Sequence, residues 1–158
     1  MVVDNARRVL HVSATAAASA SARGQDRNMA SIDSLTDDGR RFVSDYHLAT
    51  LSTIGRHGGI HVVAVGYTID EGIVRVITSD GTQKVRNIER DARATVAQVS
   101  GPQWLSIAGE AIIERDRAAV DHAVALYAQR YRQPRVNPRR VVIRLAPDRV
   151  MGSAGLLA

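Results

Sequence analysis

The residues best suited to chemistry in this sequence surround its single lysine, Lys84; the other residues counted with it as basic are all arginines. Ser79, Gly81 and Thr82 precede the lysine, where a strand-like segment changes into a helical one. Hydroxyl groups, a glycine, a lysine and the free N–H groups of a helix start are the components of phosphate sites. The segment therefore predicts binding of a phosphorylated small molecule. The alternative is a solvated helix start with one exposed lysine.

A second basic cluster occupies residues 130–140, which contain five arginines, two prolines and a tyrosine. The forked donors of arginine fit carboxylates and phosphates. The segment predicts a clamp for a polyanionic part of a ligand, and the alternative is a solvated loop with some arginines packed across the fold. Nucleic-acid binding is disfavoured, because only 4% of the residues are aromatic and no stacking platform is recognisable.

Several kinds of site are excluded by residues that the sequence lacks. There is no cysteine, so no thiolate nucleophile or zinc–thiolate site is possible. The five histidines are scattered without the close spacing of a metal site, and His61 predicts a hydrogen-bonding role instead. No nucleophile elbow, GxGxxG motif or Walker motif is present. Any redox or transfer chemistry therefore belongs to a bound cofactor.

The length and composition fit one domain with a proper core. The chain has 158 residues, too few for two ordinary domains. The formal net charge of +5 suits an anionic ligand. No apolar run approaches the roughly 18 residues that span a bilayer. We expect a cytoplasmic protein without a membrane partner.

Residues 1–31 differ in composition from the rest. Segment 13–22 contains only alanine, serine and threonine, and cannot bury enough surface to offset the entropy of ordering it. It also lacks the apolar core of a signal peptide. We expect a disordered extension, or a true translation start at Met29, with a transit-like or partner-binding tail as the less favoured alternative. The folded domain is then expected over 32–158.

Strand-like segments dominate the expected domain. Strands are predicted over 47–54, 60–69, 73–78, 94–99, 104–113 and 141–145, and helices over 37–46, 82–90 and 116–131. Glycine-rich turns at 55–59 and 70–72 predict hairpins, and Gly109 inside a strand predicts a bulge or a close approach. Because the strands follow one another in hairpins, a mostly β fold with peripheral helices, an antiparallel barrel, is favoured over a βαβ fold.

Five segments, in this order, resemble a known family: HLATLST at 47–53, HVVAVG at 61–66, TQKVRN at 82–87, WLSIAG at 104–109 and NPRRVV at 137–142. The chain resembles the pyridoxamine-phosphate-oxidase-like superfamily of six-stranded antiparallel split β-barrels. Within it, the chain most resembles the actinobacterial deazaflavin-dependent enzymes that use coenzyme F420, in particular the biliverdin reductases. The resemblance covers nearly all of 35–156.

The resemblance implies a homodimer with two cofactor sites at the subunit interface. The strand expected along the deazaflavin ring contributes His61, Val62, Val63, Ala64, Val65 and Gly66. The cofactor's phosphate and nearby groups would contact Thr78, Ser79, Gln83, Lys84 and Asn87, with Arg86 near its acidic tail. Three residues would reach in from the partner subunit: Trp104, Arg139 and Arg140. Thr82 stands where phosphate-binding relatives often carry an arginine, so phosphate affinity depends more heavily on Lys84.

The activity that the resemblance implies is hydride transfer from F420H2 to a bridging methine carbon of a linear tetrapyrrole such as biliverdin, giving bilirubin. A proton would reach a pyrrole nitrogen from water or an arginine, and no catalytic side chain is assigned. The protein would hold donor and acceptor carbons about 3–3.5 Å apart. Two alternatives stay open: a non-catalytic carrier of F420, FMN or haem, and an FMN-dependent enzyme like pyridoxamine-phosphate oxidase.

Overall fold

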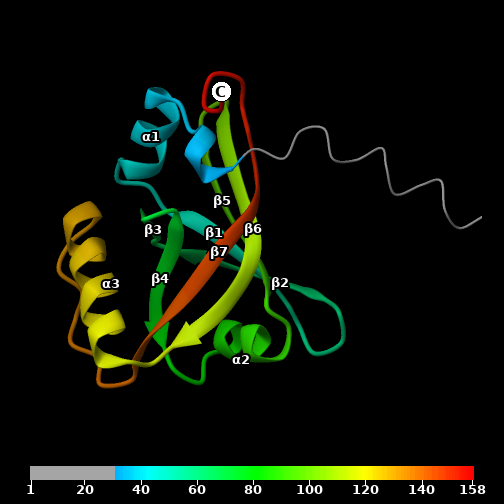
Figure 1. Ribbon diagram of the computed structural model, residues 1–158. Coiled ribbons are helices and arrows are strands. Elements are labelled where there is room, and N and C mark those ends of the chain that lie inside the picture. Colours follow the sequence, from blue (N-terminus) through cyan, green and yellow to red (C-terminus); the bar gives the residue numbers. More distant parts are fainter. Residues whose placement is uncertain (1–30) are drawn as a thin grey trace, which may run out of the picture.

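The computed structural model describes residues 31–158, and the predictions for residues 1–30 lie outside this part. Three α-helices surround one strongly curved sheet (Figure 1). The elements in chain order are the 3₁₀ helix η1 (Ile32–Ser34), α1 (Asp37–Ser44), β1 (Ala49–Ile54), β2 (Ile60–Val65), β3 (Thr68–Asp70), β4 (Ile73–Ser79), α2 (Gln83–Arg90), β5 (Arg93–Ser100), β6 (Gln103–Glu114), α3 (Arg117–Arg130) and β7 (Arg140–Gly152).

Two of the helices begin where side-chain capping predicts. Thr36 precedes α1, and its hydroxyl accepts the N–H of Gly39 at 3.0 Å. Asp116 precedes α3, and its carboxylate accepts the N–H of Ala119 at 3.1 Å. Each cap satisfies an N–H group that has no partner within the helix. None of the helices within residues 31–158 has the length and apolar character needed to cross a bilayer.

The sheet is antiparallel throughout, in the strand order β2-β1-β5-β6-β7-β4-β3. It is not closed, so β2 and β3 form its two edges. These edge strands are nevertheless consecutive in the chain, with only Gly66 and Tyr67 between them. The sheet must therefore curl until its edges meet near these two residues, which is the geometry of a split barrel. The prediction of a mostly β split barrel with peripheral helices is confirmed.

The number of strands differs from the expected six, because the segment predicted as one strand over 60–69 is broken. At the break, the N–H of Tyr67 bonds to the hydroxyl of Tyr131 at 3.1 Å. The Tyr67 carbonyl accepts from Arg130 at 2.6 Å. These side chains at the end of α3 take the place of a neighbouring strand, so β2 pairs with β1 whereas β3 pairs with β4. Seven strands result.

The last strand is longer than the predicted 141–145 and runs to Gly152. Beyond Leu145, β7 pairs with β6 alone, so its other edge has no neighbouring strand there. Pro147 has no N–H group to donate, and at this unpaired edge no backbone hydrogen bond of the sheet is lost. The predicted irregularity at Gly109 is confirmed. The register shifts between Ala108 and Gly109, and a Cβ on Gly109 would lie 2.0 Å from the Ala146 carbonyl oxygen.

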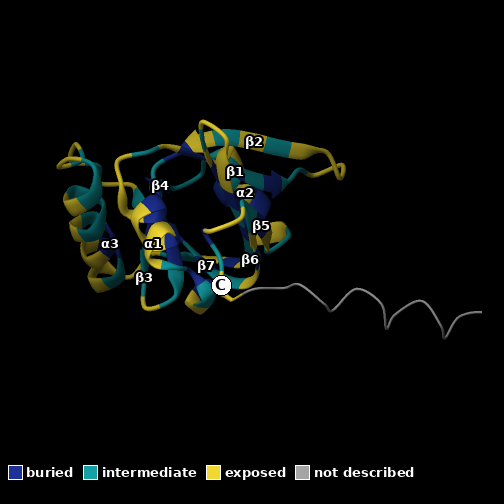
Figure 2. Ribbon diagram, turned by 90° about the horizontal axis from the view of Figure 1, so that it is seen from above, coloured by how far each residue is buried: buried dark blue, intermediate teal, exposed yellow. Residues whose placement is uncertain are grey.

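The core lies inside the curved sheet and is closed by helices (Figure 2). Fully buried side chains there come from five strands and from the β2–β3 junction: Leu51, Tyr67, Val74, Val96, Leu105, Ile107, Ile143 and Leu145. Helix α2 contacts β1 and β6, whereas α3 lies beside β3, β4 and β7 (Figure 1). The ends of β2 and β4, the start of α2 and the loop after α3 are thereby brought to one region.

Candidate functional site

A small cavity of about 210 Å³ lies where the two edges of the curled sheet approach each other. Its lining combines β2, β4, the start of α2, the end of α3 and the loop that follows: Ala64, Val65, Gly66, Ile77, Thr78, Lys84, Tyr127, Pro134 and Arg140. Six of these were predicted as cofactor-binding residues from the sequence: Ala64, Val65, Gly66, Thr78, Lys84 and Arg140. The predicted set therefore converges in part on one place.

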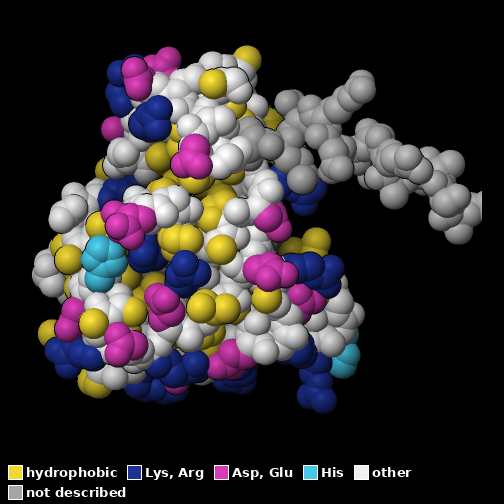
Figure 3. All heavy atoms as spheres, in the orientation of Figure 1, with side chains coloured by type: hydrophobic (Ala, Val, Ile, Leu, Met, Phe, Trp, Pro, Cys, Tyr) yellow, Lys and Arg dark blue, Asp and Glu magenta, His cyan; other side chains and the backbone are white. Residues whose placement is uncertain are grey.

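Two larger cavities continue from this one along α3 and the loop 131–139. The first, of about 430 Å³, adds Arg132, Gln133 and Arg135 to the shared residues Tyr127, Pro134 and Arg140. The second, of about 620 Å³, extends past Arg135 to the side of α3 that carries Val120 and Val124. We call the three cavities together the cationic cleft. Basic side chains gather along the lower border of the molecule, below α3 and α2 (Figure 3).

The start of α2 supplies the donors of the cleft. Thr82 is the N-cap residue but makes no side-chain capping bond, and its hydroxyl donates to the Ser79 carbonyl at 3.0 Å. The first-turn N–H groups are thus not satisfied by the cap. Lys84 lies in the same turn, half-buried, and burial lowers its pKa from the usual value. Within residues 31–158 no carboxylate pairs with it. An uncapped helix start beside a free ammonium group favours an anion.

Three arginines hold the loop that leads into α2. Arg86 donates to the Gly81 carbonyl at 2.9 and 2.6 Å, and Arg139 donates to the Asp80 carbonyl at 2.9 Å. Arg115 pairs with the Asp80 carboxylate at 2.8 Å, and its hydrogen bond lowers the pKa of that carboxyl group. The predicted site residues Arg86 and Arg139 therefore shape the loop from outside. Neither lines the small cavity.

Asn87 lies behind the cleft and is fully buried. Its amide donates to the Thr53 hydroxyl at 3.0 Å and accepts from Gln83 at 2.8 Å. The Thr53 hydroxyl in turn lies 3.5 Å from Nδ1 of His61. Asn87 thus fastens α2 to β1 and fixes the side chain of Gln83. Its own polar atoms are already bonded within the chain, so its contribution to a ligand site is to position the helix.

Other predicted residues lie apart from the small cavity. Val62 points outward from β2 with 53% of its surface exposed, and Val63 lies on the opposite side of that strand, packed against the core. Ser79 accepts from the Asn137 amide at 2.7 Å. Trp104 lines a separate cavity of about 430 Å³ beside Met151 and the C-terminal turn. Arg140 was expected to come from a partner subunit, but it lines the cleft of its own chain.

Three lining residues were not predicted as part of the site: Ile77, Tyr127 and Pro134. Pro134 belongs to the arginine-rich loop, which was the sequence signal nearest to it. Tyr127 lies on the same face of α3 as Val120 and Val124, a pattern that by itself indicates packing of the helix against the sheet rather than ligand binding. No cluster of histidine, aspartate and glutamate that could hold a metal ion occurs within residues 31–158.

Comparison with known proteins identifies the fold and the family together. Residues 35–153 match the family model described as pyridoxamine 5'-phosphate oxidase. The chain belongs to this family. It is also 50% identical over 125 residues to an F420H2-dependent biliverdin reductase from Mycobacterium tuberculosis (strain CDC 1551 / Oshkosh), covering 78% of this chain and 91% of that protein. The resemblance drawn from the five sequence segments is confirmed.

Several solved structures share the fold at lower identity. A conserved hypothetical protein from Mycobacterium tuberculosis has a TM-score of 0.66 and 23% identity, over 77% of this chain and 88% of that one. A structure described as an F420 reductase has a TM-score of 0.61 and 20% identity, over 71% of this chain and 94% of that one. A haem-binding protein from Mycobacterium smegmatis has a TM-score of 0.60 and 22% identity, over 75% of this chain and 53% of that one.

Proposed function

We propose that this protein is an F420H2-dependent reductase of a linear tetrapyrrole, converting biliverdin to bilirubin. The observation that carries the proposal is the 50% identity to a relative of that activity over 91% of the relative's length. The cationic cleft supports it, because a deazaflavin cofactor brings a phosphate and an acidic tail. The tetrapyrrole itself carries two propionates, which suit the same set of arginines.

The residues present fit the anionic parts of F420. Its phosphate would lie at the first turn of α2, beside Lys84 and the hydroxyl of Thr78, where N–H donors and an ammonium group converge. Its oligoglutamate tail would follow Arg140, Arg132 and Arg135 along the loop. The ring system would lie along β2 outside the small cavity, where the small side chain of Ala64 leaves room, with His61, Val63, Val65 and Gly66 on the same segment.

When bound, reduced F420 supplies the hydride, and the chain supplies binding and orientation. Lys84 and the helix start fix one end of the cofactor, while the arginines of the loop fix its tail. No carboxyl or imidazole group lines the small cavity. The proton that completes the reduction therefore comes from water or from a cationic side chain.

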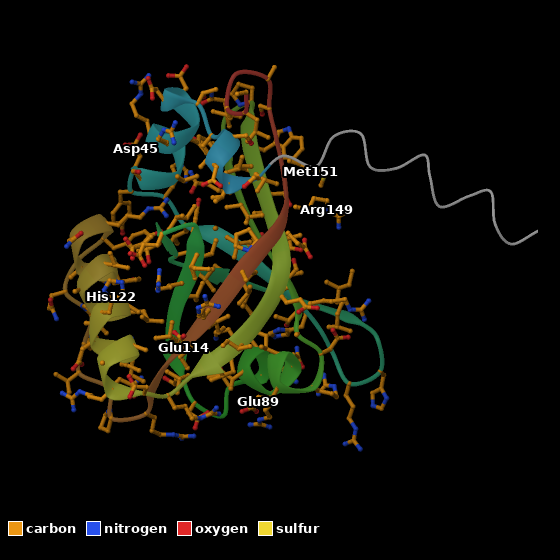
Figure 4. The ribbon with its side chains drawn as sticks, viewed as in Figure 1. Asp45, Glu89, Glu114, His122, Arg149 and Met151 are labelled. Atoms are coloured by element: carbon orange, nitrogen blue, oxygen red, sulfur yellow. The ribbon has the colours of Figure 1, made fainter. Side chains whose placement is uncertain are left out.

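The outer face of the sheet supports a homodimer. Ala64, Thr50 and Ala97 lie side by side across β2, β1 and β5, and Val99 pairs with Trp104 farther along. Exposed apolar side chains continue over this face: Ile60, Val62, Val99, Trp104 and Met151. Within residues 31–158, α1 and α2 lie against the opposite face, bonded to the sheet through Gln98 and Thr53. Met151 and Arg149 project from β7 on the side away from α3 (Figure 4).

A second copy of the chain would cover this face and bring Trp104 toward the partner's cleft. Sedimentation of the purified protein is expected to give a dimer. Val62→Arg places a charge on the face and is expected to yield monomers, whereas Val136→Arg changes an equally apolar, exposed loop residue and is expected to sediment like the wild type. A wild-type monomer would remove the homodimer from the proposal.

The proposed activity is tested by binding and turnover together. Purified protein is titrated with F420, FMN and haem, and F420H2 oxidation is followed with biliverdin as acceptor. Tight F420 binding with biliverdin-dependent oxidation is expected, without activity from NADPH or reduced FMN. Co-purifying FMN and no F420 binding would defeat the proposal. Bound F420H2 that stays reduced after single-turnover mixing with biliverdin would indicate a carrier instead.

A further inference from the structure

Within the cationic cleft, the small cavity beside Lys84 and the cavity of about 430 Å³ meet at residues that line both, and we call these two cavities the small and the large compartment. The cavities of about 210 and 430 Å³ share only Tyr127, Pro134 and Arg140. Pockets that hold a whole drug-sized ligand measure about 300–1,000 Å³. The small compartment beside Lys84 is below that range and suits one group of a ligand, whereas the large compartment has room for a longer part of it. Of the three shared residues, Tyr127 is the one with an aromatic ring.

The ring of Tyr127 is wedged against the backbone at Gly66. A Cβ on Gly66 would lie 2.7 Å from Cε2 of Tyr127, closer than side chains tolerate. On its other side the ring packs on Tyr131, with centroids 4.7 Å apart and planes tilted by 33°. A Cβ on Gly66 would also lie 3.1 Å from Cε2 of Tyr131, so two tyrosines of this chain fill the space that the glycine leaves next to β2, with Tyr127 the nearer. Gly66 is needed to seat that ring.

Tyr131 is in turn a fixed support. Its hydroxyl donates to the His47 carbonyl at 2.8 Å and accepts the N–H of Tyr67 at 3.1 Å. Tyr46 contacts its ring edge-on at 5.3 Å. Because Tyr131 is bonded to backbone on two segments, it cannot yield without disturbing both. Tyr127 is held in one position between Gly66 and this support.

We propose that Tyr127 is a specificity-determining residue that contacts the bound cofactor at the passage between the compartments. Its ring narrows the entrance to the Lys84 compartment, so that a slim anionic group such as a phosphate enters and a tetrapyrrole does not. The inference rests on the proposed function for the identity of the cofactor. It adds that Gly66 acts on the ligand mainly through Tyr127, its nearest side-chain neighbour.

The test is a double-mutant cycle read by F420 dissociation constants, biliverdin KM and melting temperature. Tyr127→Ala is expected to weaken F420 binding about 3- to 10-fold, the scale of one aromatic contact. Tyr127→Phe keeps the ring and is expected to stay within about twofold of the wild type. Gly66→Ala pushes the ring into the passage and also weakens binding. In the double variant the nearest contact of the new methyl group is gone, so most of the Gly66→Ala effect is expected to disappear.

Tyr46→Ala is the matched control, because it removes an aromatic contact with Tyr131 but lines no part of the cleft. Its F420 dissociation constant is expected to equal that of the wild type. Unchanged F420 binding by Tyr127→Ala overturns the inference, as does a Gly66→Ala effect that is undiminished in the double variant. If Gly66→Ala does not fold, F420 binding by the Tyr127 and Tyr46 variants still tests the inference.

The series is run with FMN in parallel, so that failure of the two proposals can be told apart. If the wild-type protein binds FMN but not F420, the proposed function is wrong. The FMN dissociation constants of the wild type and Tyr127→Ala then test whether Tyr127 contacts the cofactor. Wild-type protein that binds neither defeats both. Wild-type protein that binds F420 while Tyr127→Ala binds it equally well defeats the inference alone.

Discussion

Helices α2 and α3 begin in opposite ways. The first turn of α3 is capped by the Asp116 carboxylate, which accepts the Ala119 N–H. The first turn of α2 has no side-chain cap, and its Thr82 hydroxyl is turned toward the Ser79 carbonyl. α2 carries Lys84 where α1 carries aspartates. A helix start without a side-chain cap leaves its N–H donors available to a ligand, whereas a capped helix start contributes to the stability of the fold.

The largest effect that separates the two helix starts is expected from Lys84→Ala. Loss of a charged hydrogen bond weakens binding by about 1.5–3 kcal/mol, or roughly 10- to 150-fold in the F420 dissociation constant. A fluorescence titration measures it. Arg56→Ala, which removes an exposed cation in the β1–β2 turn, is the control and is expected to bind normally. An unchanged F420 dissociation constant for Lys84→Ala would mean that the phosphate binds elsewhere.

Asp116→Ala is expected to do the reverse at α3. Removal of the cap lowers the free energy of unfolding by about 0.5–2 kcal/mol, measured by urea denaturation. The F420 dissociation constant is expected to stay unchanged, because Asp116 lines none of the cleft. A large loss of binding in this folded variant would show that the two helix starts are not separate in function.

Thr82→Asp gives α2 the cap that it lacks. The new carboxylate is expected to raise the free energy of unfolding by up to about 1 kcal/mol. It also places a negative charge beside the phosphate, so F420 binding is expected to weaken. Thr82→Asn caps without charge and is the matched variant, expected to stabilise with a smaller loss of affinity. Equal affinities for both variants would argue against an anion at this turn.

The sequence predicted best what neighbouring residues decide. The starts of α1 and α3 follow from Thr36 and Asp116, whose caps act within three residues. The bulge at Gly109 was also visible, since a glycine inside a strand often marks a bulge or the close approach of another backbone segment. The segment that brings Lys84 to the small cavity is likewise local. These features needed no knowledge of the curled sheet.

Contacts between distant segments were the ones missed. The break after β2 depends on Arg130 and Tyr131, more than 60 residues farther along. The family resemblance implied that Asn87 contacts the cofactor, whereas here its side chain faces Thr53 and is buried. The resemblance also implied that Arg140 reaches in from a partner subunit, and nothing in the sequence indicated that Arg140 lines the cleft of its own chain. Local patterns do not contain such information.

The smallest effect concerns pH. Burial lowers the pKa of Lys84 below the ordinary lysine value of 10.5, since it disfavours the charged form. A bound anion favours the ammonium group, so affinity is fully present while Lys84 is protonated and falls as pH rises through its lowered pKa. Without ligand the sign reverses, because deprotonation relieves the cost of burying the charge and stability rises over the same range.

Lys84→Arg isolates this effect, because a guanidinium stays charged throughout. The ratio of F420 dissociation constants for the wild type and this variant cancels any titration of the cofactor itself. That ratio is expected to rise with pH already below the ordinary lysine value of 10.5, as the wild-type ammonium group loses its proton at its lowered pKa. A ratio that stays flat to the ordinary lysine value of 10.5 would mean that Lys84 is as well solvated as an exposed lysine. The uncapped helix start would then have to hold the phosphate without help from a buried charge.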